Sequence, residues 1–157
     1  MKRRVVSVLV MIALLFVSGI LFAEGQKESG EAQQSGSKAE VIRETVNDFF
    51  ASIPADNNKI GQKEFVEMVK AGEDPFILSI RQAKDYNEGH VEGAVNVPWG
   101  PNFAKSLDFM PADETVYVYC YSGQTAGQTV ALLEMAGIDA KSVNLGYNFG
   151  ISKVEGV

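Results

Sequence analysis

Apolar residues recur every three to four positions in three stretches of the chain, which is the spacing of a helix with one buried face. We therefore predict helices over residues 40–50, 62–71 and 125–135. A small helix is expected at 102–109, and the polar segment RQAKDYNEGH (81–90) is expected to begin with a helical turn.

Four short segments alternate with these helical segments or follow them, and the first of the four is a nearly continuous apolar run. They are PFILSI (75–80), AVNVP (94–98), TVYVY (115–119) and DAKSVNL (139–145). Runs of this length and composition are typical of strands buried on both faces. Because strands and helices alternate, the pattern predicts an α/β domain with a parallel sheet covered on both faces.

The N-terminus has a different pattern. A basic start, MKRR, precedes an apolar run from Val5 to Phe22, and Ala23 follows as a small residue at a cleavage position. We predict a signal peptide over residues 1–23. The run is about 18 residues long, or about 27 Å as a helix, so an uncleaved membrane anchor stays open as the alternative. Either reading predicts an exported protein, periplasmic or otherwise extracytoplasmic.

Residues 24–39 lack hydrophobic periodicity and are rich in Gly, Ser, Gln and Glu, which predicts a flexible linker. The folded domain is then expected over residues 40–157, with the first helix as an N-terminal extension. The chain carries a formal net charge of −6. An acidic surface repels phosphate backbones, so we expect no nucleic-acid partner.

The chain contains one cysteine and one histidine. One thiol cannot form a disulfide within the chain, and the two residues do not make a metal-binding cluster. Nucleotide-binding glycine motifs are also missing from the sequence, so we expect neither a metal nor a cofactor. The single thiol, Cys120, is therefore either an inert buried residue or a reactive one.

Cys120 stands where the strand 115–119 gives way to the helix near Thr125, with Ser122 and Gly123 allowing a tight curl. Peptide N–H groups in such a curl point inward, and the helix N-terminus adds partial positive charge. Both favour a thiolate. At an ordinary pKa of about 8.5 only about 3% of a thiol is ionised at pH 7, and a pKa about two units lower raises that to about 75%. Cys120 is thus a candidate nucleophile, the alternative being a small apolar residue at a strand end.

Two motifs resemble those of the rhodanese sulfurtransferases. CYSGQTA (120–126) is similar to the active-site loop of that family, and FILSIRQAKDYNEGHVEGAVNVPWG (76–100) is similar to its other hallmark segment. The resemblance covers about residues 58–150. It implies a three-layer fold with a central parallel sheet of about five strands and helices on both faces.

The resemblance also implies a chemistry. Cys120 takes a sulfane sulfur from thiosulfate, a polysulfide or a persulfide and passes it to a thiol, cyanide or a protein acceptor. The loop residues Tyr121 to Thr125, with Gly123 and Gln124 among them, are expected to bind the anion, and Ser122 and Thr125 to assist. A related phosphatase needs a longer loop ending in arginine, and this loop contains none.

Two positions depart from the family pattern. Thr125 stands where a basic residue is frequent, which favours a polysulfide or protein persulfide over the thiosulfate dianion. Ser79, two positions before Arg81, stands where the family pattern has an acidic residue. Four residues are expected to support the site: Arg81, Ser79, His90 and Trp99. Arg81 is expected to bond loop carbonyls, the alternative being that it attracts anionic donors. His90 is expected to build a turn, the alternative being a base, and Trp99 to pack in the core or rim, the alternative being that it lines the substrate pocket.

Two other functions remain open from the sequence. The first is a non-catalytic role as a persulfide carrier or as a module that binds a partner through its loop. The second is a thiol redox sensor, which requires an intermolecular disulfide or a sulfenic acid on Cys120.

Overall fold

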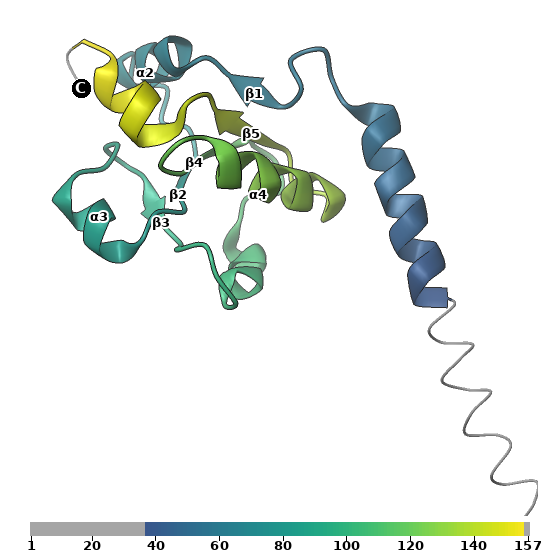
Figure 1. Ribbon diagram of the computed structural model, residues 1–157. Coiled ribbons are helices and arrows are strands. Elements are labelled where there is room, and N and C mark those ends of the chain that lie inside the picture. The colour runs from purple at the N-terminus through teal and green to yellow at the C-terminus, as the bar shows by residue number, and fades with distance from the viewer. Residues whose placement is uncertain (1–36, 156–157) are drawn as a thin grey trace, which may run out of the picture. The chain divides into compact units, whose positions relative to one another are not determined.

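The computed structural model describes residues 37–155 (Figure 1). The predicted signal peptide and residues 24–36 of the predicted linker lie outside the described residues. Residues 37–52 are helical, so the N-terminal helix begins three residues before the expected boundary. The chain divides into two units, Met1–Val46 and Asn47–Val157, and the second contains the sheet. Within residues 37–155, no helix combines enough length with enough apolar character to cross a bilayer.

The second unit is built on a five-stranded sheet in which every neighbouring pair is parallel. The strand order is β1-β5-β4-β2-β3. The strands are β1 Lys59–Ile60, β2 Ile77–Ser79, β3 Val95–Asn96, β4 Val116–Tyr119 and β5 Ala140–Val143. The predicted α/β architecture is confirmed, and β4, which leads into Cys120, lies in the middle of the sheet.

Helical segments lie between the strands and after the last one. They are α2 Gln62–Lys70, α3 Ala83–Glu88, the 3₁₀ segment η1 Phe103–Phe109, α4 Gln124–Met135, the π-helical η2 Gly146–Gly150 and the 3₁₀ segment η3 Ile151–Lys153. The predicted helices at 62–71, 102–109 and 125–135 match α2, η1 and α4 closely. The sequence did not predict β1, η2 or η3.

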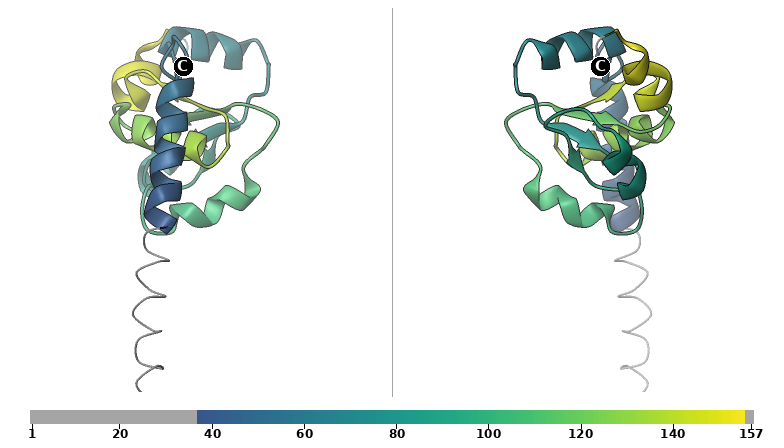
Figure 2. Two further views of the ribbon diagram at one scale, coloured as in Figure 1. Left: turned by 90° about the vertical axis from the view of Figure 1, so that its right-hand side faces the viewer. Right: turned by 90° about the vertical axis from the view of Figure 1, so that its left-hand side faces the viewer.

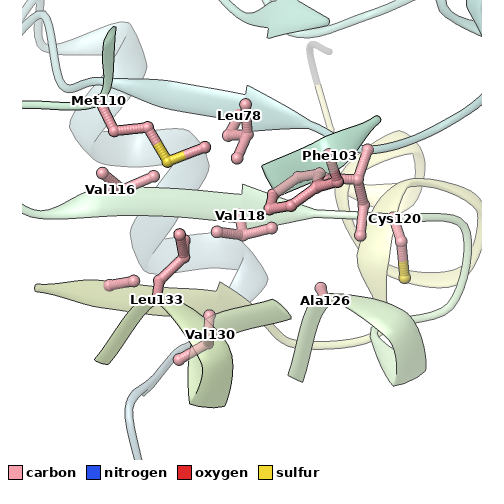
Figure 3. Packing of buried hydrophobic residues seen from close by; sticks show 11 residues of the cluster. Leu78, Phe103, Met110, Val116, Val118, Cys120, Ala126, Val130 and Leu133 are labelled. Atoms are coloured by element: carbon pink, nitrogen blue, oxygen red, sulfur yellow. The ribbon is translucent and has the colours of Figure 1, made fainter. Parts of the chain in front are cut away.

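Each face of the sheet is covered by its own hydrophobic cluster, because successive strand residues point to opposite faces. On one face Leu78, Val118 and Cys120 pack with Phe103 of η1 and Val130 of α4. This cluster is drawn in Figure 3, where the helix carrying Val130 and Ala126 runs beneath the strands.

The opposite face packs Ile77, Tyr119 and Val143 against Phe65 of α2 and Ile151 of η3. Both views of Figure 2 place α2 and the C-terminal segment on one side of the strands and η1 on the other. The domain therefore has three layers, with the sheet in the middle.

Candidate functional site

Cys120 follows β4 directly, at the carboxyl end of the sheet, and α4 begins four residues later. Gly123 is the N-cap of α4 and has a φ of 90°, a left-handed conformation that glycine adopts without steric cost. This residue lets the chain reverse between the strand and the helix. The turn leaves the first N–H groups of α4 without helical partners, and they face the cysteine.

The sulfur of Cys120 lies between the strand end and the first turn of α4 (Figure 3). The Gly123 N–H donates to Sγ at 3.1 Å. The residue is only 2% exposed and packs among Phe103, Val118 and Ala126. The thiol therefore has an apolar wall on one side and peptide donors on the other.

Two opposing effects act on the pKa of Cys120. Burial raises it, since a thiolate loses hydration in an apolar setting. The Thr125 hydroxyl and the N–H groups of Ala126, Ser122 and Gly123 lower it, because each donates to the anion. The donors outweigh the burial, and the net pKa lies below the ordinary value of a cysteine thiol.

The loop residues contribute unequally. Ser122 and Gln124 are exposed, and Ser122 acts on the sulfur through its backbone N–H. Thr125 is half-buried and acts through its hydroxyl. Ala126, which the sequence analysis did not include in the anion-binding loop, is fully buried and adds a further N–H.

The segment after β5, which contains η2, is hydrogen-bonded to the backbone of the cysteine loop. The N–H groups of Tyr147 and Asn148 donate to the carbonyls of Cys120 and Tyr121 at 2.8 and 2.9 Å. In a trans peptide the N–H points opposite to the carbonyl, so these bonds turn the N–H groups of Tyr121 and Ser122 away from η2. The orientation of the loop peptides is thus set by η2.

Gly146 makes this close approach feasible. Its φ is 57°, and a Cβ at this position would lie 2.7 Å from the Cys120 carbonyl oxygen and 2.8 Å from the Ser122 nitrogen. A side chain here would displace the loop. Gly146, Tyr147 and Asn148 were not predictable as site residues, because a short polar and glycine-containing segment gives no periodic signal.

The side chain of Tyr121 contacts residues near α3 and not the Cys120 sulfur. Its hydroxyl donates to the carboxylate of Asp85, and the Gln82 N–H donates to the same hydroxyl at 3.0 Å. The Arg81 guanidinium carbon lies 5.5 Å from the centre of its ring. Tyr121 therefore anchors the loop on the side of Arg81 and α3.

Arg81 is 5% exposed and belongs to the structural framework of this sheet edge. Its Nη1 and Nη2 donate to the carbonyls of Gly89 and Asp85 at 2.8 and 2.6 Å. Its guanidinium carbon lies 4.0 Å from the ring centre of Tyr147. These contacts occupy the cation with backbone oxygens and an aromatic ring. The oxygens are those of Gly89 and Asp85, not carbonyls of the cysteine loop.

Ser79 is fully buried, and among the described residues neither its hydroxyl nor the Arg81 Nε has a hydrogen-bond partner. Since residues two apart on a strand share a face, Ser79 and Arg81 lie on the face opposite Cys120. The structure does not bring Ser79 to the sulfur.

His90 and Trp99 occupy different places. His90 is exposed, stacks on Tyr86 with ring centres 3.9 Å apart, and places Nδ1 2.9 Å from the Tyr86 carbonyl oxygen. Trp99 is half-buried, packs on the cluster that contains Cys120, and lies 5.7 Å from the Phe103 ring. His90 thus shapes a turn, and Trp99 supports the apolar wall beside the thiol.

A family model described as "Rhodanese-like domain" matches residues 61–150, which is more than half of the chain. Two curated relatives are similar. "Putative sulfur carrier protein YrkF" of Bacillus subtilis is 26% identical over 87 residues, which cover 55% of this chain and 44% of that protein. "Thiosulfate sulfurtransferase PspE" of Escherichia coli is 31% identical over 61 residues, which cover 38% and 59%. The chain thus spans about half the length of the curated relatives that it matches.

Solved structures show the same fold. The protein SSP1007 of Staphylococcus saprophyticus is 26% identical, with a TM-score of 0.56 over 62% of this chain and 98% of that one. A rhodanese-like domain protein of Staphylococcus aureus is 23% identical, with a TM-score of 0.55 over 59% and 89%. The three-layer fold expected from the sequence is confirmed.

Proposed function

Because this chain belongs to the rhodanese-like domain family, we propose that it is an exported sulfurtransferase that carries sulfane sulfur as a persulfide on Cys120. The observation that carries the proposal is the surroundings of the sulfur. One hydroxyl and three peptide N–H groups lower the pKa of the thiol despite its burial. A thiolate held in this way is a nucleophile, and the same donors suit a persulfide anion.

The reaction has two steps. The Cys120 thiolate attacks the outer sulfur of a donor such as thiosulfate, a new S–S bond forms, and the donor's S–S bond breaks to release sulfite with its electron pair. The terminal sulfur of the persulfide is then attacked by cyanide or a thiolate. That bond forms as the Cys120–S bond breaks, which gives thiocyanate or a new persulfide and returns the thiolate.

The loop has no cation to hold a compact dianion such as thiosulfate. Thr125 offers a hydroxyl where a cation would grip a dianion, and Arg81 is engaged on the opposite face of the sheet. A polysulfide or a protein persulfide therefore suits this loop better than thiosulfate. The acceptor is a small thiol, cyanide or a thiol on a protein.

Export rests on the N-terminal sequence, where MKRR and the run Val5 to Phe22 form a signal segment. Intact mass of the chain recovered from the producing cell tests this step. Loss of residues 1–23 supports a cleaved signal. A full-length mass in the membrane fraction supports an anchor, and a full-length mass in the cytoplasm contradicts export.

The test of sulfur transfer compares the wild type with Cys120→Ser, using thiosulfate and then polysulfide as donor. We expect the wild type to gain about 32 Da, one sulfur atom, and to release it to cyanide. The serine variant should do neither. Full activity in Cys120→Ser would end the proposal, and a gain of about 16 Da in place of sulfur would favour the redox sensor.

A second candidate is a non-catalytic persulfide carrier, and the likeness to YrkF favours it. Turnover separates the two functions. A carrier loads one sulfur per chain and stops with small acceptors, whereas a sulfurtransferase produces many equivalents of thiocyanate.

A further inference from the structure

Asp85 forms a contact that none of the functions above uses. It lies in the first turn of α3, is half-buried, and its carboxylate accepts the hydroxyl of Tyr121. Within residues 37–155 the ion pairs are Lys84–Glu88 and Lys141–Asp56, so Asp85 is engaged by a phenol rather than by a cation. A half-buried carboxylate that holds a neutral donor makes a charge-assisted hydrogen bond, which is stronger than a neutral one.

This contact acts on the residue next to the nucleophile. Tyr121 is held at its backbone by the Asn148 N–H and at its hydroxyl by Asp85 and Gln82. Burial and then the Asp85 carboxylate raise the pKa of this phenol, so it stays protonated and keeps donating at neutral pH. Side chain and main chain together therefore fix Tyr121, the residue between Cys120 and Ser122.

We propose that Asp85 is a positioning residue for the Cys120 loop and acts through the hydroxyl of Tyr121. The proposal rests on the proposed function, since it takes Cys120 as the nucleophile. Asp85 ties the loop to α3 at a sheet edge where the buried residue at position 79 is a serine whose hydroxyl has no partner among the described residues. Without the tie, the peptide donors that face the sulfur lose their alignment.

A positioning role and a direct electrostatic effect of the Asp85 charge predict opposite shifts in the pKa of Cys120. Removing a carboxylate removes negative charge, which by itself favours a thiolate and lowers the pKa of the cysteine. Arg81, which faces the Tyr121 ring and bonds the Asp85 carbonyl, stays in place in either case. Loss of positioning instead weakens the donors and raises the pKa of Cys120.

The experiment measures the alkylation rate of Cys120 by iodoacetamide as a function of pH in the full-length chain, where one cysteine reports alone. The variants are Tyr121→Phe, which removes only the hydroxyl, Asp85→Ala and Asp85→Asn. Glu88→Ala is the matched control, since it removes an exposed carboxylate from the same helix. Circular dichroism establishes that each variant is folded.

We expect Tyr121→Phe and Asp85→Ala to raise the thiol pKa and to slow alkylation at pH 7 by about threefold to tenfold. The double variant should be no slower than either single one, because both remove the same contact. Asp85→Asn keeps an acceptor oxygen but loses the charge assistance, so it should fall between wild type and Asp85→Ala. Glu88→Ala should stay near wild type.

A wild-type profile in folded Tyr121→Phe, or a lowered pKa in Asp85→Ala, would overturn the proposal. If Asp85→Ala fails to fold, Tyr121→Phe alone decides the outcome. Because alkylation needs no sulfur donor, a chain that transfers no sulfur yet shows these shifts would refute the sulfurtransferase and leave the positioning role standing.

Discussion

At the scale of single residues, Thr125 provides a side-chain donor to Cys120 where Ser122, Gly123 and Ala126 provide peptide N–H groups. Thr125→Val keeps the shape and removes the hydroxyl. We expect the pKa of the thiol to rise and alkylation at pH 7 to slow by about threefold to tenfold. Ser122→Ala is the control, because that side chain is exposed and only its backbone contributes. Equal behaviour of the two variants would contradict this role of Thr125.

The neutral loop also leads to a prediction about donors. Thr125→Lys places a cation near the compact thiosulfate dianion and should lower the KM for thiosulfate about tenfold, with a smaller change for polysulfide, whose charge is spread over a longer chain. Gln128→Lys adds the same charge at an exposed position in α4 outside the loop. Steady-state kinetics with both donors give the answer. A similar gain from Gln128→Lys would show that overall charge, and not the loop, sets the preference.

The lowered pKa of Cys120 also links stability to pH. A thiol whose folded pKa lies below its unfolded value of about 8.5 stabilises the fold fully above that value. This stability is lost as the pH falls through the folded pKa. Urea unfolding of the wild type and Cys120→Ser should therefore show the wild type gaining stability relative to the variant as pH rises toward about 9. A constant or shrinking difference would contradict the shift.

At the scale of elements, strong local patterns were predictable and weak ones were not. The strand β4 and the helix α4 were predictable, because the apolar run TVYVY and the helical period that follows it are both long enough to be recognised. β1 has only Lys59 and Ile60 and follows a polar stretch, so no run marks it. The segment η2 carries no periodicity, and its contacts with the cysteine loop exist only once the chain has folded.

Gly146 tests the role of η2. Gly146→Ala forces an L side chain into a φ of 57° and within 2.8 Å of three loop atoms. We expect a loss of about 3 kcal/mol in unfolding free energy together with slower alkylation of Cys120. Gly93→Ala is the control, with a φ of 78° but nothing within 4 Å of the added Cβ. It should cost about 1–2 kcal/mol and leave the thiol unchanged.

An effect on the thiol in Gly93→Ala equal to that in Gly146→Ala would mean that general destabilisation, and not contact with the loop, governs reactivity. Native thiol reactivity in folded Gly146→Ala would show that the loop does not depend on η2.

At the scale of the whole molecule, the sheet order places β4 between β5 and β2, so the cysteine emerges at the centre of one sheet edge. The position of the loop was predictable from the alternation of strands and helices. The face of the sheet on which each of these side chains lies was not predictable from that alternation. Cys120 points toward α4, whereas Tyr121 and Arg81 meet on the other face. Arg81 therefore belongs to the structural framework, and Asp85 of α3 contacts the cysteine loop through Tyr121.

The most direct test of the account is the pH profile of iodoacetamide alkylation of Cys120 in the full-length native chain, compared with the same chain in urea. The one cysteine makes the readout unambiguous. We predict a native midpoint below the value of about 8.5 expected for the unfolded thiol. A native midpoint equal to or above that of the unfolded chain would contradict it.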